Sequence, residues 1–184
     1  INPHFLYNAL AAISALALRE GQGQTVKCVK YLADFYRISL NKGKQVLSIR
    51  EELELLKNYL NIQKVRFGES IQVEYEVKKE LLTLKTIKLL LQPLVENSIH
   101  HGRRSEEEIL MIRVSIFLEG DRVRFSVEDN GNGIKQEKLE KLRGQLEQFE
   151  EGYGLKNVHN RVRFTYGEGY GVKIDSVSGV GTRV

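Results

Sequence analysis

The stretch SVEDNGNGIKQ, residues 126–136, joins the end of an alternating apolar pattern to a pair of closely spaced glycines. The alternation predicts a strand that ends at Asp129, and Gly131 and Gly133 follow it in a D-x-G-x-G spacing. An Asp-Asn-Gly turn after a strand is ordinary, so two interpretations stay open: a simple turn, or a ligand site. In a site, the carboxylate would accept a hydrogen bond from an amine, and the glycines would let a flat ring approach the backbone.

Two further glycine pairs follow along the chain. In GYGLKNVHNRV, residues 152–162, Gly152 and Gly154 precede a predicted helix. Free amides and the positive end of the helix dipole suit phosphate oxygens, and the alternative is a flexible turn. In SGVGTRV, residues 178–184, Thr182 is either a plain strand residue or a hydroxyl that faces the ligand.

The stretch VENSIHHG, residues 95–102, places Asn97 on a helix that begins in LLLQPL. An inward-facing amide there is costly unless it bonds the backbone or a ligand. An amide oxygen is a hard ligand, suited to a magnesium ion that also binds phosphates. A satisfied asparagine near the helix end is the alternative interpretation.

The pattern after residue 68 predicts an α+β domain, with one mixed sheet and helices on one face. The segment 135–151 is polar and charge-rich, either a helix or a mobile segment. No internal repeat is seen. Strands are expected at residues 71–77, 110–118, 122–128, 171–177 and 181–184, and helices at 89–102 and 154–167.

The N-terminal part predicts a helical hairpin. Apolar residues recur at helical spacing in 5–17 and again in 26–40, and the linker EGQGQ between them is short enough to make the helices antiparallel neighbours. The apolar stripe is wider than one partner helix can cover, so we expect two hairpins to form a four-helix bundle, a homodimer. A third helix is predicted from the capping box of Ser48 and Glu51 to Gly68. The expected domains are 1–47, a connecting helix 48–68, and 69–184.

Composition excludes some classes of protein. The chain has 184 residues with 28 basic and 24 acidic side chains, and the charges alternate apart from the pair Arg103 and Arg104. Without a basic cluster, nucleic acid is not an expected partner. The single Cys28 excludes an internal disulfide and favours a reducing setting. No apolar run approaches the roughly 20 residues that span a bilayer.

The order of the motifs is more specific than any one of them. ENxxxHG, D-x-G-x-G, G-x-G-L-x-N and G-x-G-T together resemble the Bergerat ATP-binding fold of gyrase, chaperone, histidine-kinase and mismatch-repair ATPases, over about residues 69–184. The resemblance implies a two-layer α/β sandwich, ATP and Mg²⁺ as cofactors, Asn97 on the metal, Asp129 on adenine, and 135–151 as a mobile lid. It also implies that the following residues surround the base and the phosphates: His100, His101, Gly102, Gly131, Gly133, Ile134, Gly152, Tyr153, Gly154, Leu155, Lys156 and Thr182.

The opening INPHFLYNAL resembles the N-P-H-F phosphoacceptor box of the autolysin-sensor type of bacterial sensor histidine kinases. The match continues with YLADFYRISL, residues 31–40, and YLNIQKVRFG, residues 59–68. It implies that His4 accepts the γ-phosphoryl group of ATP and passes it to an aspartate of a response regulator receiver domain. It also implies a cytoplasmic domain of an inner-membrane protein, anchored by segments outside this sequence.

Chemistry at His4 is coherent with its neighbours. An imidazole with the ordinary pKa of about 6.5 is mostly neutral near pH 7 and offers a lone pair for attack. Asn8, on the same helical face, would hold the other N–H, orient a water that removes the phosphate, or face solvent. Pro3 follows Asn2 either as the first helical residue after an N-cap or as a kink in a helix that began upstream.

Two departures from the family and two rival functions remain. The residue after His4 is Phe5, where many sensor kinases have a carboxylate base, so Glu96 is a substitute candidate. His100 stands where relatives often carry lysine. An ATP-hydrolysing clamp of the gyrase or chaperone kind would need a glutamate at the position of Pro93, and proline cannot act as a base. A degenerate kinase that binds nucleotide or only dimerises is the other rival.

Overall fold

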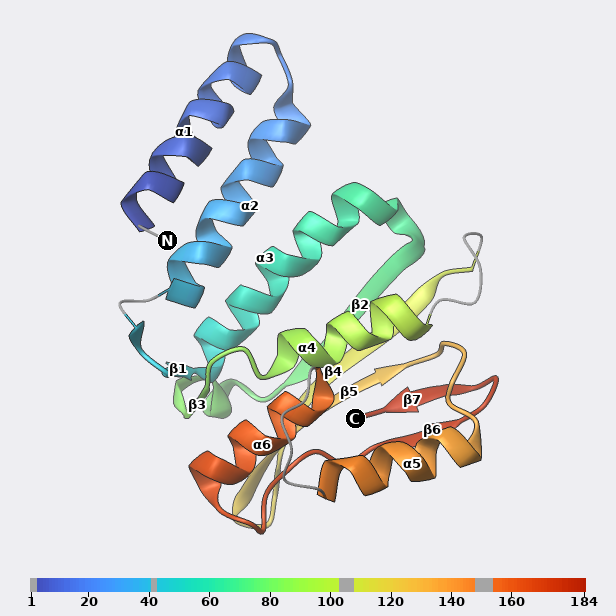
Figure 1. The fold of residues 1–184 in the computed structure, drawn as a ribbon. Coiled ribbons are helices and arrows are strands. Elements are labelled where there is room, and N and C mark those ends of the chain that lie inside the picture. Colours follow the sequence, from blue (N-terminus) through green and yellow to red (C-terminus); the bar gives the residue numbers. More distant parts are fainter. Residues whose placement is uncertain (1–2, 41–42, 103–107, 148–153) are drawn as a thin grey trace.

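The computed structural model describes residues 3–40, 43–102, 108–147 and 154–184, apart from the side chains of residues 3–9 and 147. Helices α1 (Pro3–Arg19) and α2 (Gly23–Leu40) form the expected hairpin and lie side by side (Figure 1). Gly21 makes the turn between them with a φ of 70°, a left-handed conformation that favours glycine. The turn lies away from the sheet domain, so the start of α1 and the end of α2 lie toward it (Figure 1).

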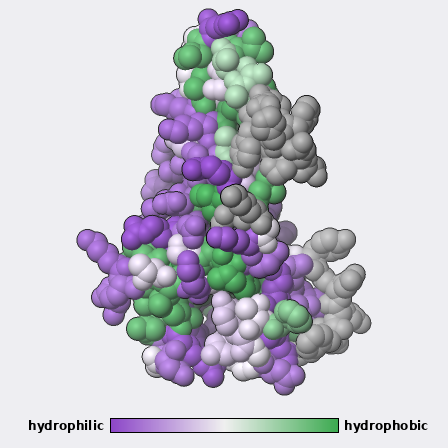
Figure 2. All heavy atoms as spheres, turned by 90° about the vertical axis from the view of Figure 1, so that its left-hand side faces the viewer, coloured by the Kyte–Doolittle hydropathy of each residue, from purple (hydrophilic) through white to green (hydrophobic). Residues whose placement is uncertain are grey.

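The hairpin leaves much of its apolar surface uncovered. Leu10 and Ala17 of α1 are buried, whereas Ile13, Leu16 and Leu18 are 48%, 58% and 69% exposed. No side chain of α2 is fully buried. Figure 2, which views the molecule from the left of Figure 1, shows apolar side chains at the surface of the upper part. A single hairpin therefore does not complete its own core.

Helix α3 (Ile49–Phe67) begins at the predicted capping box. The Ser48 backbone N–H donates to the Glu51 carboxylate at 2.7 Å, and the Glu51 N–H donates to the Ser48 hydroxyl at 3.2 Å. The helix ends at Gly68, whose φ is 59°. Both ends were predicted correctly because each depends on local chemistry: reciprocal capping at the start and a left-handed glycine at the end.

The sheet is mixed, as expected. Its strands are β2 (Ile71–Val77), β4 (Leu110–Glu119), β5 (Arg122–Asp129), β7 (Gly181–Arg183) and β6 (Asp175–Val177), in the order β2-β4-β5-β7-β6. The pair β2 and β4 is parallel, and the other neighbours are antiparallel. In the β5 and β7 ladder Asp129 lies opposite Thr182, which brings the first and third glycine stretches to one end of the sheet.

Strand β6 is shorter than the sequence predicts. The alternation suggested a strand from residue 171, but the strand begins at Asp175. Before it, the Val172 N–H donates to Nδ1 of the buried His159 at 3.1 Å, and the Ile174 carbonyl accepts from the Arg143 guanidinium. These backbone groups bond side chains of neighbouring helices, so they are not available to a strand ladder.

The helices cover one face of the sheet (Figure 1). They are α4 (Leu91–Asn97), continued by one wider π-helical turn, η4 (Ser98–Gly102), then α5 (Gln136–Glu147) and α6 (Leu155–Tyr166). Short 3₁₀ turns, η2 (Gly68–Ser70) and η3 (Lys79–Thr83), flank β2. Strands β1 (Val46–Ser48) and β3 (Lys85–Ile87) form a separate small antiparallel sheet that the sequence did not predict.

One apolar core joins α3, α4 and α6 to the sheet. Leu56 of α3, Leu91 of α4, Val158 of α6 and Ile112 of β4 all belong to it and are at most 1% exposed. Helix α3 therefore packs as part of the sheet domain, although the domain boundaries at 47 and 68 stay predictions. A smaller cluster under α5 contains Leu139, Leu146 and Ile174.

Candidate functional site

Asn97 lies at the end of α4, beside a hollow of about 470 Å³. Its amide nitrogen donates to the Pro93 carbonyl one turn earlier, at 2.7 Å. This bond fixes the amide plane and leaves the oxygen Oδ1 as the group that is free to accept or to ligate. The hollow is lined by Pro93, Glu96, Asn97, His100, His101 and Gly154.

Gly154 brings the start of α6 to the same place. It is the N-cap residue of α6, with a φ of 64°, and no side chain caps the helix start. A Cβ added at Gly154 would lie 3.9 Å from Asn97 Oδ1, so any larger residue would narrow the space between the two helices. The positive end of the α6 dipole and an amide oxygen on α4 therefore face one hollow, which suits an anion that carries a metal ion.

Asp129 lies at the end of β5 and is 7% exposed. Its Oδ2 accepts from the Ser98 hydroxyl at 2.8 Å, and its Oδ1 accepts from the Gly131 N–H at 3.0 Å. The two bonds orient the carboxylate, and each oxygen still has capacity to accept another bond. Because Ser98 directly follows Asn97, the same turn of chain positions both predicted ligand groups.

The D-x-G-x-G glycines are required by the protein's own backbone. A Cβ at Gly131 would lie 2.3 Å from the Gly102 carbonyl oxygen, and a Cβ at Gly133 would lie 1.9 Å from the Val177 carbonyl oxygen. Gly133 also has a φ of 62°. These contacts hold the turn against η4 and the turn between β6 and β7, so the close packing of the site explains the glycines before any ligand is considered.

This packing predicts opposite effects for two Gly→Ala substitutions. Gly133→Ala is expected to lower the free energy of unfolding by about 2 kcal/mol or more, because the methyl group meets backbone at a left-handed φ. Gly144→Ala, in α5 with nothing within 4 Å of the added Cβ, is expected to raise it by about 0.5 to 1 kcal/mol. Urea unfolding of both variants measures the difference. Equal effects would contradict the backbone account.

The third glycine stretch has a structural role. Thr182 is a strand residue of β7, and its hydroxyl lies 2.9 Å from the Ser176 hydroxyl of β6. Ser176 also accepts from the Ile134 N–H at 2.8 Å. Contact of the Thr182 hydroxyl with a ligand stays a prediction. Ile134 and Leu155 pack against the cluster under α5.

Glu96, the candidate base, lies on the rim of the hollow. Its carboxylate is 3.8 Å from Nε2 of His100, and both side chains are about half exposed. On the α3 side, burial raises the pKa of Tyr59 to about 12, and the nearby Glu96 charge adds to the shift. Among the residues that the structure describes, no hydrogen-bond donor holds Glu96 firmly, and His100 would form an ion pair with it only when protonated.

The predicted site residues fall into groups. Glu96, Asn97, His100, His101 and Gly154 line the hollow together. Asp129 does not line it, but it accepts a hydrogen bond from Ser98, the residue after Asn97. Gly152 and Tyr153 lie outside the described residues, as do the side chains of His4 and Asn8, whose backbone belongs to α1. Ser98 and the Pro93 carbonyl are positioning groups that the sequence did not predict, because no spacing signal marks them.

A divalent ion would depend on few protein ligands here. In the described ranges, no group of three or more His, Cys, Asp or Glu side chains is arranged to hold a metal. The donor set fits a Mg²⁺ ion that binds Asn97 Oδ1 and takes its other ligands from phosphates and water, because this ion usually keeps several waters.

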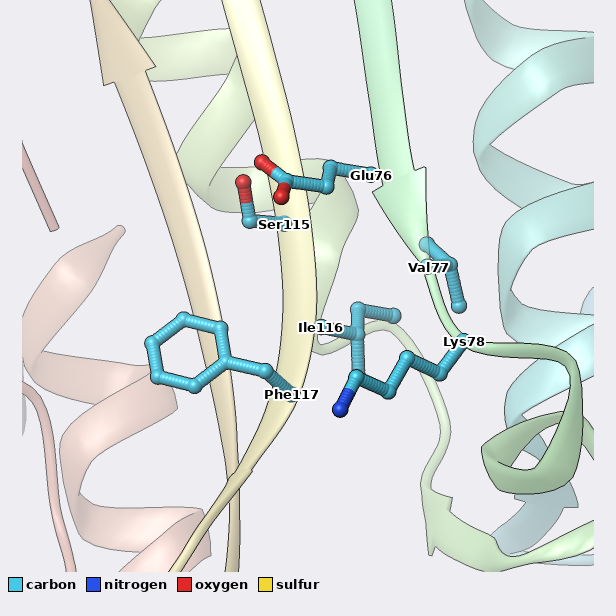
Figure 3. A pocket seen from close by; sticks show the side chains of 6 residues that line it. All are labelled: Glu76, Val77, Lys78, Ser115, Ile116 and Phe117. Atoms are coloured by element: carbon cyan, nitrogen blue, oxygen red, sulfur yellow. The ribbon is translucent and has the colours of Figure 1, made fainter.

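A second hollow, of about 300 Å³, lies elsewhere, between the end of β2 and the adjacent residues of β4 (Figure 3). It offers a mixture of apolar side chains with a glutamate, a lysine and a serine, without a helix start or a glycine turn. We therefore assign the candidate site to the Asn97 hollow. The lining of the second hollow is Glu76, Val77, Lys78, Ser115, Ile116 and Phe117.

Comparison with known proteins agrees with this geometry. Residues 1–71 match the family described as histidine kinase, and residues 83–184 match the family of histidine kinase-, DNA gyrase B-, and HSP90-like ATPases. The sensor histidine kinase YesM of Bacillus subtilis is 36% identical over the whole chain, and YpdA of Escherichia coli is 36% identical over 94% of it. The sensor protein LytS of Bacillus cereus is 32% identical over the whole chain. The chain covers 31%, 30% and 32% of these relatives.

Solved structures share the fold. The histidine kinase domain of a blue-light activated kinase from Erythrobacter litoralis superposes with a TM-score of 0.54 at 16% identity, covering 98% of this chain and 92% of that one. The catalytic domain of the histidine kinase ThkA gives 0.53 at 18% identity, over 75% and 89%. These likenesses confirm the α+β fold class.

None of the helices in the described part of the chain has the length and hydrophobicity to span a bilayer. The matched relatives and family profiles extend over both the hairpin and the sheet domain. The chain therefore belongs to the histidine kinases, and its C-terminal part is an ATPase domain of the kind shared with DNA gyrase B and HSP90.

Proposed function

We propose that the chain is the kinase part of a two-component sensor: it binds ATP with Mg²⁺, phosphorylates itself on His4, and passes the phosphoryl group to an aspartate of a response regulator receiver domain. The observation that carries the proposal is that Asn97 and Gly154 line one hollow, while the carboxylate of Asp129 is bonded to Ser98, the residue that follows Asn97. An amide oxygen, a helix start and a buried carboxylate are the groups needed for a metal, a phosphate chain and an amine.

Each of these groups has a distinct role in nucleotide binding. Asp129 would accept from the exocyclic amine of adenine, and the start of α6 at Gly154 would face the phosphates. Asn97 Oδ1 would bind the Mg²⁺ ion, which neutralises phosphate charge when bound. His100 and His101, which line the hollow, would contact the phosphates, and Lys156 in the first turn of α6 is a further candidate for such a contact.

The transfer step is an in-line substitution at the γ-phosphorus. A nitrogen of the neutral His4 imidazole attacks with its lone pair, the new N–P bond forms, and the bond from the γ-phosphorus to the bridging oxygen breaks. ADP leaves with that electron pair. The proton on the other ring nitrogen passes to a base, for which Glu96 is our candidate, while Asn8 orients the ring or a water.

Two observations support transfer over simple hydrolysis. His4 belongs to the first turn of α1, and the open end of the hairpin lies toward the sheet domain (Figure 1). Pro93 lies one turn before Asn97 and lines the hollow, where a hydrolysing clamp would need a glutamate to activate water. A site without that base preserves the phosphoryl group for histidine.

Labelling the purified chain with γ-labelled ATP and Mg²⁺ tests the proposed function. We expect label that is lost in acid and kept in alkali, as for a phosphoramidate, and that moves to a receiver domain when one is added. A chain that binds ATP but takes up no label would support the degenerate kinase instead. Release of inorganic phosphate without labelled protein would support the hydrolysing clamp.

We also propose that the hairpin forms a homodimer. The exposed apolar residues of α1 support this, because a second hairpin would cover them in a four-helix bundle. ATP is a cytoplasmic metabolite, so we place this part of the protein in the cytoplasm, as a domain of an inner-membrane protein.

A double substitution tests the dimer. Ile13→Glu with Leu16→Glu is expected to convert a species of twice 21.1 kDa into a monomer, because the new charges would be buried between hairpins. The matched control is Leu118→Glu, which also replaces a half-exposed leucine, 54% exposed, but in β4. Light scattering after size-exclusion chromatography measures the mass. A monomeric unchanged chain, or a dimeric double variant, would contradict the proposal.

A further inference from the structure

The loop Lys88–Leu90, which leads into α4, is held by a buried carboxylate from another helix. Glu52 of α3 is 0% exposed. Its Oε2 accepts from the Leu89 N–H at 2.9 Å, and its Oε1 accepts from the N–H groups of Leu90 and Leu91 at 2.6 and 2.9 Å. One side chain therefore satisfies several N–H groups at the start of α4, which have no partner within the helix.

The same loop is tied to two more helices. Arg161 of α6 donates to the carbonyls of Lys88 and Leu89. The Lys88 ammonium donates to the Ser39 carbonyl, in the last turn of α2, at 2.6 Å. A short loop thus links α4, where Asn97 lies, to α6, which begins after Gly154. It also links both helices to the hairpin, whose first helix contains His4.

This arrangement is costly to maintain. Burying a carboxylate is unfavourable, and burial raises the pKa of Glu52 although the backbone N–H bonds oppose the shift. Leu89 has a φ of 58°, a left-handed conformation that is unfavourable for a residue with a Cβ. An apolar side chain in place of Glu52 would avoid the first cost and would leave the α4 donors unpaired.

We propose that Glu52 is a positioning residue for the nucleotide site, which fixes the first turn of α4 and thereby places Asn97 opposite Gly154. Asn97 follows Leu91 by about 9 Å along a helix of 1.5 Å rise, so a shift of the first turn moves the amide with it. Arg161 bonds α6 to the same loop, so this loop fixes the positions of both helices that line the hollow. The inference rests on the proposed function in taking Asn97 as the metal ligand.

The test compares affinity for a non-hydrolysable ATP analogue with Mg²⁺ and with EDTA. Glu52→Gln keeps the size of the side chain but replaces one accepting oxygen with an NH₂ group. This NH₂ group cannot accept from the backbone N–H that it faces. The Mg²⁺ gain is the ratio of the affinity with Mg²⁺ to the affinity with EDTA. We expect Glu52→Gln to lower this gain by about tenfold, the usual effect of losing a residue that positions a metal ligand. Its affinity in EDTA should stay within about twofold of the unchanged chain. Glu54→Gln, an exposed glutamate on the same helix, is the matched control.

Arg161→Gln provides a second variant that leaves the buried carboxylate in place, and we expect it to reduce the Mg²⁺ gain in the same direction. A purely structural role would lower the melting temperature of both variants and leave the Mg²⁺ gain of the folded protein unchanged, which would overturn the proposal. If the unchanged chain shows no Mg²⁺ gain, the metal site itself is wrong, and the proposal fails with it. The two failures are distinguishable, because an unchanged Mg²⁺ gain in the variants contradicts only the role of Glu52, whereas the absence of a gain in the unchanged chain contradicts the metal site.

Discussion

A His4→Gln variant is expected to take up at least about 100-fold less label from γ-labelled ATP than the unchanged chain, because glutamine has no nucleophilic nitrogen lone pair. Its affinity for ATP should stay within about twofold, since the hollow is lined by residues of α4, η4 and α6. Autoradiography of the protein measures the first quantity, and titration calorimetry measures the second.

The control for this variant is Arg19→Gln, an exposed position at the far end of the same helix, which should label normally. Full labelling of His4→Gln would contradict the assignment of the acceptor. In that case His100 and His101 are the next candidates, because both line the hollow directly.

An Asp129→Asn variant is expected to lose most of its preference for adenine nucleotides over guanine nucleotides. A hydrogen bond from an amine to a charged acceptor contributes about 1.5 to 3 kcal/mol, so the Kd for ADP should rise about 10- to 150-fold. Guanine presents an oxygen where adenine presents an amine, and an asparagine amide can donate to it. The ratio of GDP to ADP affinity should therefore rise as well, which general damage to the site would not produce.

Glu128→Gln is the matched control for Asp129→Asn. Glu128 is the neighbouring acidic residue of β5 and pairs with Arg183 on the partly exposed face, at 3.1 Å. We expect its nucleotide affinities to match those of the unchanged chain. An Asp129→Asn variant that keeps both ADP affinity and base preference would show that Asp129 holds Ser98 and Gly131 and does not read the base.

Local signals in the sequence predicted much of the fold. The capping box at Ser48 and Glu51, the glycine stop at Gly68 and the alternation in β2, β4 and β5 depend on neighbouring residues, so one window of sequence contains the whole cause. The first and third glycine boxes come together because Asp129, at the end of β5, lies opposite Thr182 of the antiparallel strand β7.

Features that depend on distant residues were not predicted. The pairing of β1 with β3 joins segments about forty residues apart, and β6 is short because its approach bonds to His159 and Arg143 on helices. Nothing in the sequence of α3 separates Glu52 from its acidic neighbours Glu51 and Glu54. Its role depends on where the loop before α4 folds back, which no periodicity of α3 reveals.

The glycines show where sequence and structure give different reasons for one residue. The resemblance predicted that Gly131 and Gly133 surround the base, whereas the described contacts place them against Gly102 and Val177. Tight backbone packing explains the residue type, and the ligand contacts of these glycines stay a prediction. The glycines of a motif can therefore be required by backbone packing, whether or not they touch a ligand.

A crystal structure with a non-hydrolysable ATP analogue and Mn²⁺ tests the central claim most directly, because the anomalous signal of manganese locates the metal without a model of the nucleotide. We predict a metal peak bound to Asn97 Oδ1, phosphates between Asn97 and the start of α6, and the adenine amine within hydrogen-bond distance of Asp129. A metal peak away from Asn97, or a nucleotide whose base lies away from Asp129, would contradict the account.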